Sequence, residues 1–180
     1  MELQNDIQNY QNLTIKERIY LTAFLVAVSG IMSVADSFIP KPLPFAKIGI
    51  ANCVTLILII FGQYKLSLKI AILRTLVSAL MVGTILSYTF LFSLSGAFFS
   101  TLAMIFFHHY FKGVFSIVGI SIIGAFFSTV GQSLFVILLF GADKGMVFLA
   151  SLFAAISIPS GVVIGFIGKA VIKRLGLPKE

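Results

Sequence analysis

Arg74 is the residue whose type and position point most strongly to chemistry. It lies inside a mostly apolar stretch at about residues 66–82. A guanidinium keeps its charge in proteins and presents a rigid set of donors to carboxylates and other acceptors. If the stretch crosses a membrane, burying this charge costs about 2.5 kcal/mol or more. Arg74 therefore either contacts an anionic or polar ligand, or is paired structurally with Asp36 or with backbone carbonyls.

Other polar side chains interrupt the neighbouring apolar stretches. They are Asp36, Asn52, Ser93, Ser95, Ser128 and Gln132. At about 1.5 Å per helical residue, these side chains reach similar depths in a helical bundle and lie in its outer half. Polar groups inside membrane spans usually face the protein interior or a water-filled cavity. The pattern predicts a binding pocket that opens outward, although hydrogen bonds between helices would explain Asn52 and Gln132 equally well.

A proline-rich segment, Pro40-Lys41-Pro42-Leu43-Pro44, follows the first apolar stretch and cannot continue a helix. With the residues that follow it as far as Lys47, it is expected to form a loop at the mouth of the pocket. Lys47, and less readily Lys41, would then assist an anionic ligand, whereas an ordinary loop lysine is simply solvated.

Residues for catalysis or cofactor binding are scarce. The sequence has no G-x-x-x-x-G-K-[ST] phosphate-binding loop, so we expect no ATP hydrolysis by this chain. Its six acidic residues are scattered, so no acidic pair is expected to hold a metal–diphosphate complex. His108 and His109 fall at a span boundary and suit an interface better than a metal site, and Cys53 is expected to be a small buried side chain. The sequence predicts a protein that is not an enzyme and has no cofactor.

Composition defines the class of protein that must position these residues. Of the 180 residues, 59% are apolar, and the 13 basic and 6 acidic side chains together make only 11%. A soluble domain has about 25% charged residues, and the mean hydropathy of this chain is +1.09. These values exclude a secreted disulfide scaffold, a disordered chain and an ordinary soluble enzyme. They predict a polytopic, all-α integral membrane protein.

Six apolar runs predict a compact bundle of six transmembrane helices in one domain, residues 17–168. The expected spans are 19–39, 48–61, 66–82, 88–107, 114–140 and 146–167. A spanning helix needs about 20 mostly apolar residues, so the second run is short. Residues 1–16 form a polar cytoplasmic segment, expected to include an interfacial helix that ends at Lys16-Glu17-Arg18, and residues 169–180 form a basic tail.

The positions of the basic residues predict the orientation. An even number of spans places both termini on one side, and nine of the 13 basic residues then lie on that side. Lys41, Lys47 and Lys144 lie on the other side, and Arg74 lies within the membrane. Because cytoplasmic loops carry the excess of lysine and arginine, both termini are predicted to be cytoplasmic. Topology thus explains the net charge of +7, and no nucleic-acid partner is expected.

Two stripes of small residues indicate close helix packing. Ala23-x-x-x-Ala27, followed by Gly30, lies on the first span, and Gly161-x-x-x-Gly165 lies on the sixth. Such faces let helices approach one another closely. Packing within the protein is the simplest interpretation of both stripes, but the one on the first helix would also suit the docking of a separate subunit.

Several short motifs, taken in order, resemble those of a known family. They are Pro44-Phe45-Ala46-Lys47-Ile48-Gly49-Ile50-Ala51-Asn52, Arg74, Ser93-Leu94-Ser95-Gly96, Ser100, Met104, and residues 121–132. Together they resemble the bacterial Gx transporter family, which is also labelled heptaprenyl diphosphate synthase component I. That family is similar to the substrate-binding S components of energy-coupling factor (ECF) transporters. This chain has no tryptophan, a common stacking residue in the vitamin-binding relatives, so Phe or Tyr would have to replace it.

The resemblance implies a six-helix protein of the bacterial cytoplasmic membrane that binds a micronutrient in its outer half. It also implies that Ala23 and Ala27 dock a coupling subunit, through which partner ATPases supply the energy. Arg74, Asn52 and Gln132 would fix the polar groups of a vitamin, a flavin, or an isoprenoid or quinone precursor. The loop from Pro40 to Lys47 would gate the pocket.

Two other functions are compatible with the sequence. One is a non-catalytic membrane accessory subunit of polyprenyl (heptaprenyl) diphosphate synthesis, which recruits a soluble enzyme and holds a lipid tail. The chain itself has no aspartate-rich DDxxD motif of the kind that prenyl diphosphate synthases use. The other is a solitary carrier that needs no partner.

Overall fold

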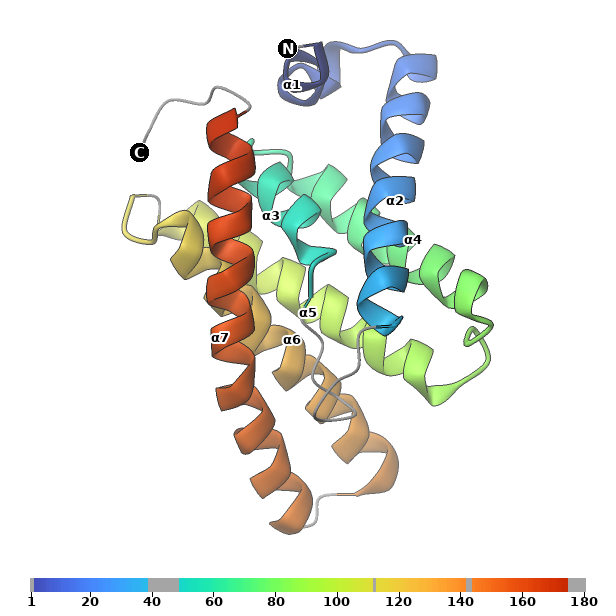
Figure 1. The fold of residues 1–180 in the computed structure, drawn as a ribbon, viewed down its shortest axis with the longest axis vertical. Helices are drawn as coiled ribbons and strands as arrows, with labels where there is room; N and C mark the ends of the chain where they lie inside the picture. Colours follow the sequence, from blue (N-terminus) through green and yellow to red (C-terminus); the bar gives the residue numbers. More distant parts are fainter. Residues whose placement is uncertain (1, 39–48, 112, 142–143, 175–180) are drawn as a thin grey trace.

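A computed structural model describes residues 2–38, 49–111, 113–141 and 144–174 (Figure 1). These residues form α-helices and one short 3-10 helix, with no strand among them. In chain order the elements are α1 (Glu2–Gln8), η1 (Tyr10–Asn12), α2 (Ile15–Phe38), α3 (Asn52–Ile60), α4 (Tyr64–Val82), α5 (Tyr88–Tyr110), α6 (Ile117–Phe140) and α7 (Lys144–Arg174). The predicted all-α class is confirmed over the described ranges.

Four of the described helices are long and apolar enough to cross a membrane. The candidate spans are Ile15–Asp36, Tyr88–Tyr110, Ile117–Leu139 and Val147–Arg174. The chain is therefore a multi-pass membrane protein. The other two predicted spans correspond to α3 and α4. With nine residues, α3 is far shorter than the roughly 20 residues of a complete crossing, and the 19 residues of α4 include Lys65, Lys69 and Arg74.

The start of α2 differs from the prediction for a local reason. Lys16-Glu17-Arg18 was expected to end an N-terminal helix, but these residues lie in the first turn of α2. The carboxylate of Glu17 accepts hydrogen bonds from the backbone N–H and the hydroxyl of Thr14, each at 2.8 Å. A threonine followed three residues later by glutamate is a capping box, which satisfies donors at a helix N-terminus. Thr14 therefore marks the start of α2.

Two other helix ends also lie beyond their predicted positions. His108-His109 does not stop α5, which ends at Tyr110, and α7 continues past residue 167 to Arg174. Tyr64 Oη and Nδ1 of His108 form a hydrogen bond at 3.0 Å, which links the start of α4 to the last turn of α5.

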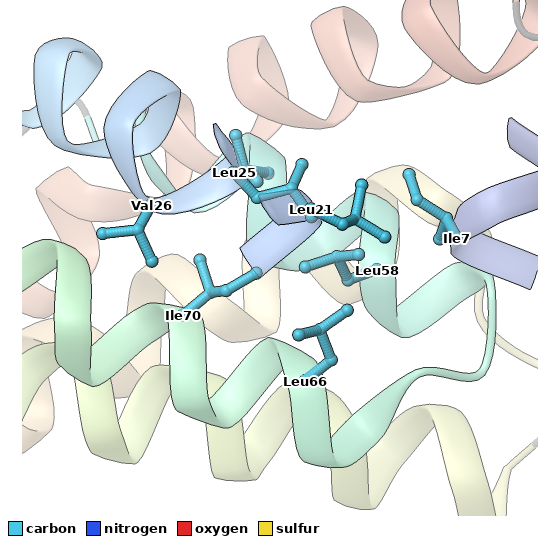
Figure 2. Packing of buried hydrophobic residues seen from close by; sticks show 8 residues of the cluster. Ile7, Leu21, Leu25, Val26, Leu58, Leu66 and Ile70 are labelled. Carbon is cyan, nitrogen blue, oxygen red and sulfur yellow. The ribbon is translucent and has the colours of Figure 1, made fainter. Parts of the chain in front are cut away.

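The N-terminal segment packs against the bundle. Ile7 of α1 is 2% exposed and belongs to a buried cluster with side chains of α2, α3 and α4 (Figure 2). That cluster comprises Ile7, Leu21, Leu25, Val26, Val54, Leu58, Leu66 and Ile70. Tyr10 Oη lies 3.1 Å from Oγ1 of Thr22, so polar contacts also hold the segment to α2. The apolar side chain of Ile7 explains why this otherwise polar segment folds back onto α2, α3 and α4.

Close contact between α6 and α7 depends on two glycines of α7. A Cβ atom built on Gly161 would lie 2.8 Å from Cα of Ile122, and one on Gly165 would lie 2.7 Å from Cα of Val118. Side chains of any size would push the two backbones apart. The Gly161-x-x-x-Gly165 stripe therefore packs within the protein, as expected.

We expect Gly165→Ala to destabilise the protein, because the added methyl would meet the backbone of α6 rather than a flexible side chain. Overpacking of this kind costs about 1–3 kcal/mol. Gly119→Ala on α6 is the matched control, since its Cβ would meet nothing closer than 3.5 Å. That control should be neutral or stabilising by up to about 1 kcal/mol. Thermal unfolding of both variants in one detergent tests this, and equal melting temperatures would contradict the tight α6–α7 contact.

Candidate functional site

The six helices from α2 to α7 all contribute to one cavity of about 290 Å³. This volume is close to the lower limit of typical ligand pockets. The wall runs from Ser33 and Asp36 on α2, through Asn52 on α3 and Arg74 on α4, to Ile164 on α7. Apolar side chains such as Phe90 and Met104 alternate with polar ones, so the lining suits a small ligand with both kinds of surface.

The structure brings most of the predicted site residues together. Arg74, Asn52, Gln132, Asp36 and Ser93 all line this cavity. Ser95 does not: its hydroxyl donates to the carbonyl of Phe92 at 3.0 Å. Residues two apart on a helix face different directions, so Ser93 and Ser95 cannot both point at one site. Lys47 and the loop from Pro40 lie outside the described residues.

Arg74 is held by α3, and not by a hydrogen bond to Asp36, which was one of the alternative structural partners. The side chain is 5% exposed, and its Nη2 donates a hydrogen bond to Oδ1 of Asn52, the first residue of α3. Within the described part of the chain its Nε has no hydrogen-bond partner. A buried charged donor without a partner costs more than about 1–3 kcal/mol. Arg74 therefore retains hydrogen-bonding capacity beside the cavity.

Asp36 contributes the opposite charge. Its side chain is 4% exposed, and Oδ2 accepts a hydrogen bond of 3.2 Å from the backbone N–H of Gly49. Gly49 has a φ of 77°, a left-handed conformation that glycine adopts without steric cost. The carboxylate attracts Arg74 electrostatically, but its Oδ1 has no hydrogen-bond partner among the described residues. The cavity is thus bordered by one buried cation and one buried anion.

Gln132 reaches the cavity because α5 has a glycine opposite it. A Cβ atom on Gly96 would lie 2.7 Å from Nε2 of Gln132, so any larger residue would collide with the amide. That amide donates a hydrogen bond from Nε2 to Oγ of Ser128, one turn earlier on α6, at 3.3 Å. This bond lies within one helix and does not bridge two helices, and Gln132 itself lines the cavity.

Sequence reasoning missed much of the hydroxyl-bearing wall. Ser33, Thr75, Ser78, Ser121, Ser157 and Ser160 also line the cavity. A signal was available on α6, where Ser121, Ser128 and Gln132 are spaced by seven and four residues and so share one helix face. On α7, Ser157 and Ser160 flank Pro159, which has no N–H to bond the preceding turn.

A second feature lies on the outside of α2. Ala23 and Ala27 are both exposed, and so are their neighbours Tyr20, Phe24 and Ile31. Gly30, in contrast, faces α4, with its Cβ position 3.3 Å from Val77. Packing within the described protein therefore accounts for Gly30 and not for Ala23 and Ala27.

Asn52→Leu should destabilise the protein, because Arg74 would lose the acceptor that Asn52 provides while staying buried. The expected loss is about 1–3 kcal/mol, the cost of leaving a buried donor unpaired. Asn52→Asp keeps an acceptor at this position and should retain stability. Ser95→Ala, which removes a hydroxyl outside the cavity, serves as the control in thermal unfolding. Equal melting of Asn52→Leu and Ser95→Ala would show that the hydrogen bond between Arg74 and Asn52 is unimportant.

Comparison with known proteins identifies the family. The family model for heptaprenyl diphosphate synthase component I matches residues 25–171, which include every residue that lines the cavity. Comparisons with curated proteins and with solved structures give no match. The name of the family describes one component of a synthase and so implies a partner component. The match confirms the resemblance to heptaprenyl diphosphate synthase component I that the motifs around Asn52 and Arg74 indicate. Because the match covers most of its length, this chain belongs to the heptaprenyl diphosphate synthase component I family.

Proposed function

We propose that this chain binds a small solute in the cavity between α2 and α7 and moves it across the membrane. The observation that carries this proposal is the burial of Arg74 and Asp36 at one cavity, each with a polar atom that has no hydrogen-bond partner among the described residues. Ionisable groups buried in membrane helices are costly, usually pair with one another or with backbone carbonyls, and mark substrate and ion pathways. The solute would be a vitamin, a flavin, or an isoprenoid or quinone precursor.

Arg74, Asn52 and Gln132 would bind the polar groups of the solute, with Asp36 and Ser93 beside them. Apolar contacts would come from Phe90 in place of a tryptophan, because its ring lines the same cavity. An aromatic ring offers a flat apolar face at little cost in conformational entropy. Lys47, outside the described residues, would add a positive charge at the mouth.

The proposed topology has six crossings and cytoplasmic termini in a bacterial cytoplasmic membrane. Figure 1 supports an even number of crossings, because α1 and the C-terminal end of α7 lie at the same end of the molecule. That end carries Lys16, Arg18, Lys173 and Arg174, which agrees with the tendency of basic residues to remain on the cytoplasmic side. In this orientation Asp36 lies in the outer half.

Energy would come from an ATP-driven complex that docks on α2. The support for this step is the exposure of Ala23 and Ala27, which leaves a smooth strip between the larger side chains of Tyr20, Phe24 and Ile31. A helix of a coupling subunit can approach such a strip closely, as small-residue faces allow in membranes. The proposed partners are therefore a coupling subunit and its ATPases.

Arg74→Gln should strongly reduce copurification of the solute while leaving the protein folded. Loss of charge-assisted hydrogen bonds worth about 1.5–3 kcal/mol corresponds to roughly tenfold to hundredfold weaker binding. Lys69→Gln is the control, because Lys69 is exposed on the same helix. Mass spectrometry of the small molecules released from each purified variant provides the measurement. Equal recovery of the same solute from both variants would remove Arg74 from the binding site.

Ala23→Leu combined with Ala27→Leu should prevent copurification of the coupling complex, because the leucines would fill the strip on α2. Ala155→Leu combined with Ala170→Leu is the matched control, since both alanines are exposed on α7. Affinity purification from the native host, followed by identification of the bound proteins, tests the effect. Retention of the complex by the α2 variant would contradict docking at this strip.

A second candidate function is favoured by the family to which the chain belongs. The chain would then be a non-catalytic membrane subunit that recruits a soluble synthase component and holds the lipid tail of its product. The same purification separates the two proposals, because a soluble prenyl synthase component would be recovered instead of ATPases. Solute uptake in a host that lacks any coupling complex would favour a solitary carrier.

A further inference from the structure

The charges that border the cavity are balanced. Among the lining residues that the structure describes, Arg74 and Asp36 are the ionisable ones, and both are at least nine-tenths buried. Every other polar residue of the lining is a neutral hydroxyl or amide. Among the described residues, the lining therefore has one positive and one negative side chain and a formal net charge of zero.

Neither charged side chain has all of its hydrogen-bonding atoms satisfied within the described part of the protein. Arg74 donates from Nη2 to Asn52, and Asp36 accepts at Oδ2 from Gly49. Each side chain keeps one buried atom without a partner in the described part of the chain, a donor on Arg74 and an acceptor on Asp36. The two side chains attract each other, yet no direct hydrogen bond between them is found. The site therefore offers a ligand one hydrogen-bond donor on α4 and one hydrogen-bond acceptor on α2.

This arrangement discriminates between solutes by charge. An anion would be attracted by Arg74 but repelled by Asp36, and a cation would experience the reverse. In a cavity of low dielectric, a net charge that leaves water without compensation is strongly disfavoured. A molecule of zero net charge avoids that penalty and still gains hydrogen bonds from both side chains. A diphosphate, with several negative charges, is poorly matched to a single guanidinium beside a carboxylate.

We propose that the cavity selects a dipolar solute of zero net charge, with an acceptor or anionic group toward Arg74 and a donor or cationic group toward Asp36. This inference rests on the proposed solute-binding function and narrows it to one class of ligand. Ser78 and Ser121 are both buried and line the same cavity, where they supply neutral hydrogen bonds to the rest of the solute.

Three probes that share a hydroxyphenyl ring and a two-carbon chain test the inference: tyrosine, a zwitterion; 3-(4-hydroxyphenyl)propionate, an anion; and tyramine, a cation. Purified protein in one detergent is titrated with each probe at millimolar concentration, and the shift of its melting temperature is converted to an apparent Kd. Tyrosine should bind the wild type at least about tenfold more tightly than either charged probe, since one uncompensated charge is worth 1.4 kcal/mol or more here.

Two conservative variants should then change which of the three probes the cavity prefers. Asp36→Asn leaves the site with a positive charge and should improve binding of the anion by about tenfold, while Arg74→Gln should do the same for the cation. A purely structural ion pair would lower stability in both variants and leave the ranking of the probes unchanged, which would overturn the inference.

The wild type also gives a result that does not depend on the variants. If it prefers the anionic probe, or if the solute that copurifies with it is retained by an anion exchanger, solute binding stands and the charge-balance inference falls. If none of the three probes shifts the melting temperature and only lipid copurifies, both the inference and the proposed solute-binding function are wrong.

Discussion

A guanidinium buried among apolar helices needs hydrogen-bond acceptors and a compensating charge from the protein in place of water. The arrangement of three helices follows from this requirement. Arg74 on α4 draws the first residue of α3 toward it through Asn52. The turn before α3 is in turn held to α2, because the N–H of Gly49 donates to Asp36. Asp36 adds a compensating charge at the same place. One buried charge thus determines how the C-terminal end of α2 and the start of α3 are placed around α4.

Glycines on the other helices allow a polar wall to form opposite this group. Gly161 brings α7 close to the backbone of α6, and Gly124 leaves space for Met104 of α5, whose Sδ lies 2.6 Å from the position of a Cβ. Gly96 leaves space for the amide of Gln132 in the same way. Because α5, α6 and α7 approach one another closely at these glycines, the hydroxyl and amide side chains on their facing sides lie close enough to line one cavity.

The short helix α3 has a different consequence at the opposite end of the bundle. Two of its buried side chains, Val54 and Leu58, pack in one cluster with side chains of α1, α2 and α4. Ile7 contributes to the cluster that includes Leu58 of α3 and Leu66 of α4, as Figure 2 shows. The N-terminal segment is therefore part of the packed structure, although its polar composition suggests a solvated lead-in. Burial of a single apolar side chain of this size is worth about 1.5–3 kcal/mol.

The sequence by itself determined the helical membrane class, the family and the polar residues that lie inside apolar runs, because composition and depth along a helix suffice for these. Tertiary structure decided which of those residues meet. Ser93 lines the cavity and Ser95 does not, because the rotation of α5 about its axis selects one face. Arg74 bonds Asn52 rather than Asp36 for a related reason: the acceptor that it reaches depends on how three helices are turned and spaced. The residue type determines which hydrogen bonds a side chain can make, and only the packing of the helices determines which residue is its partner.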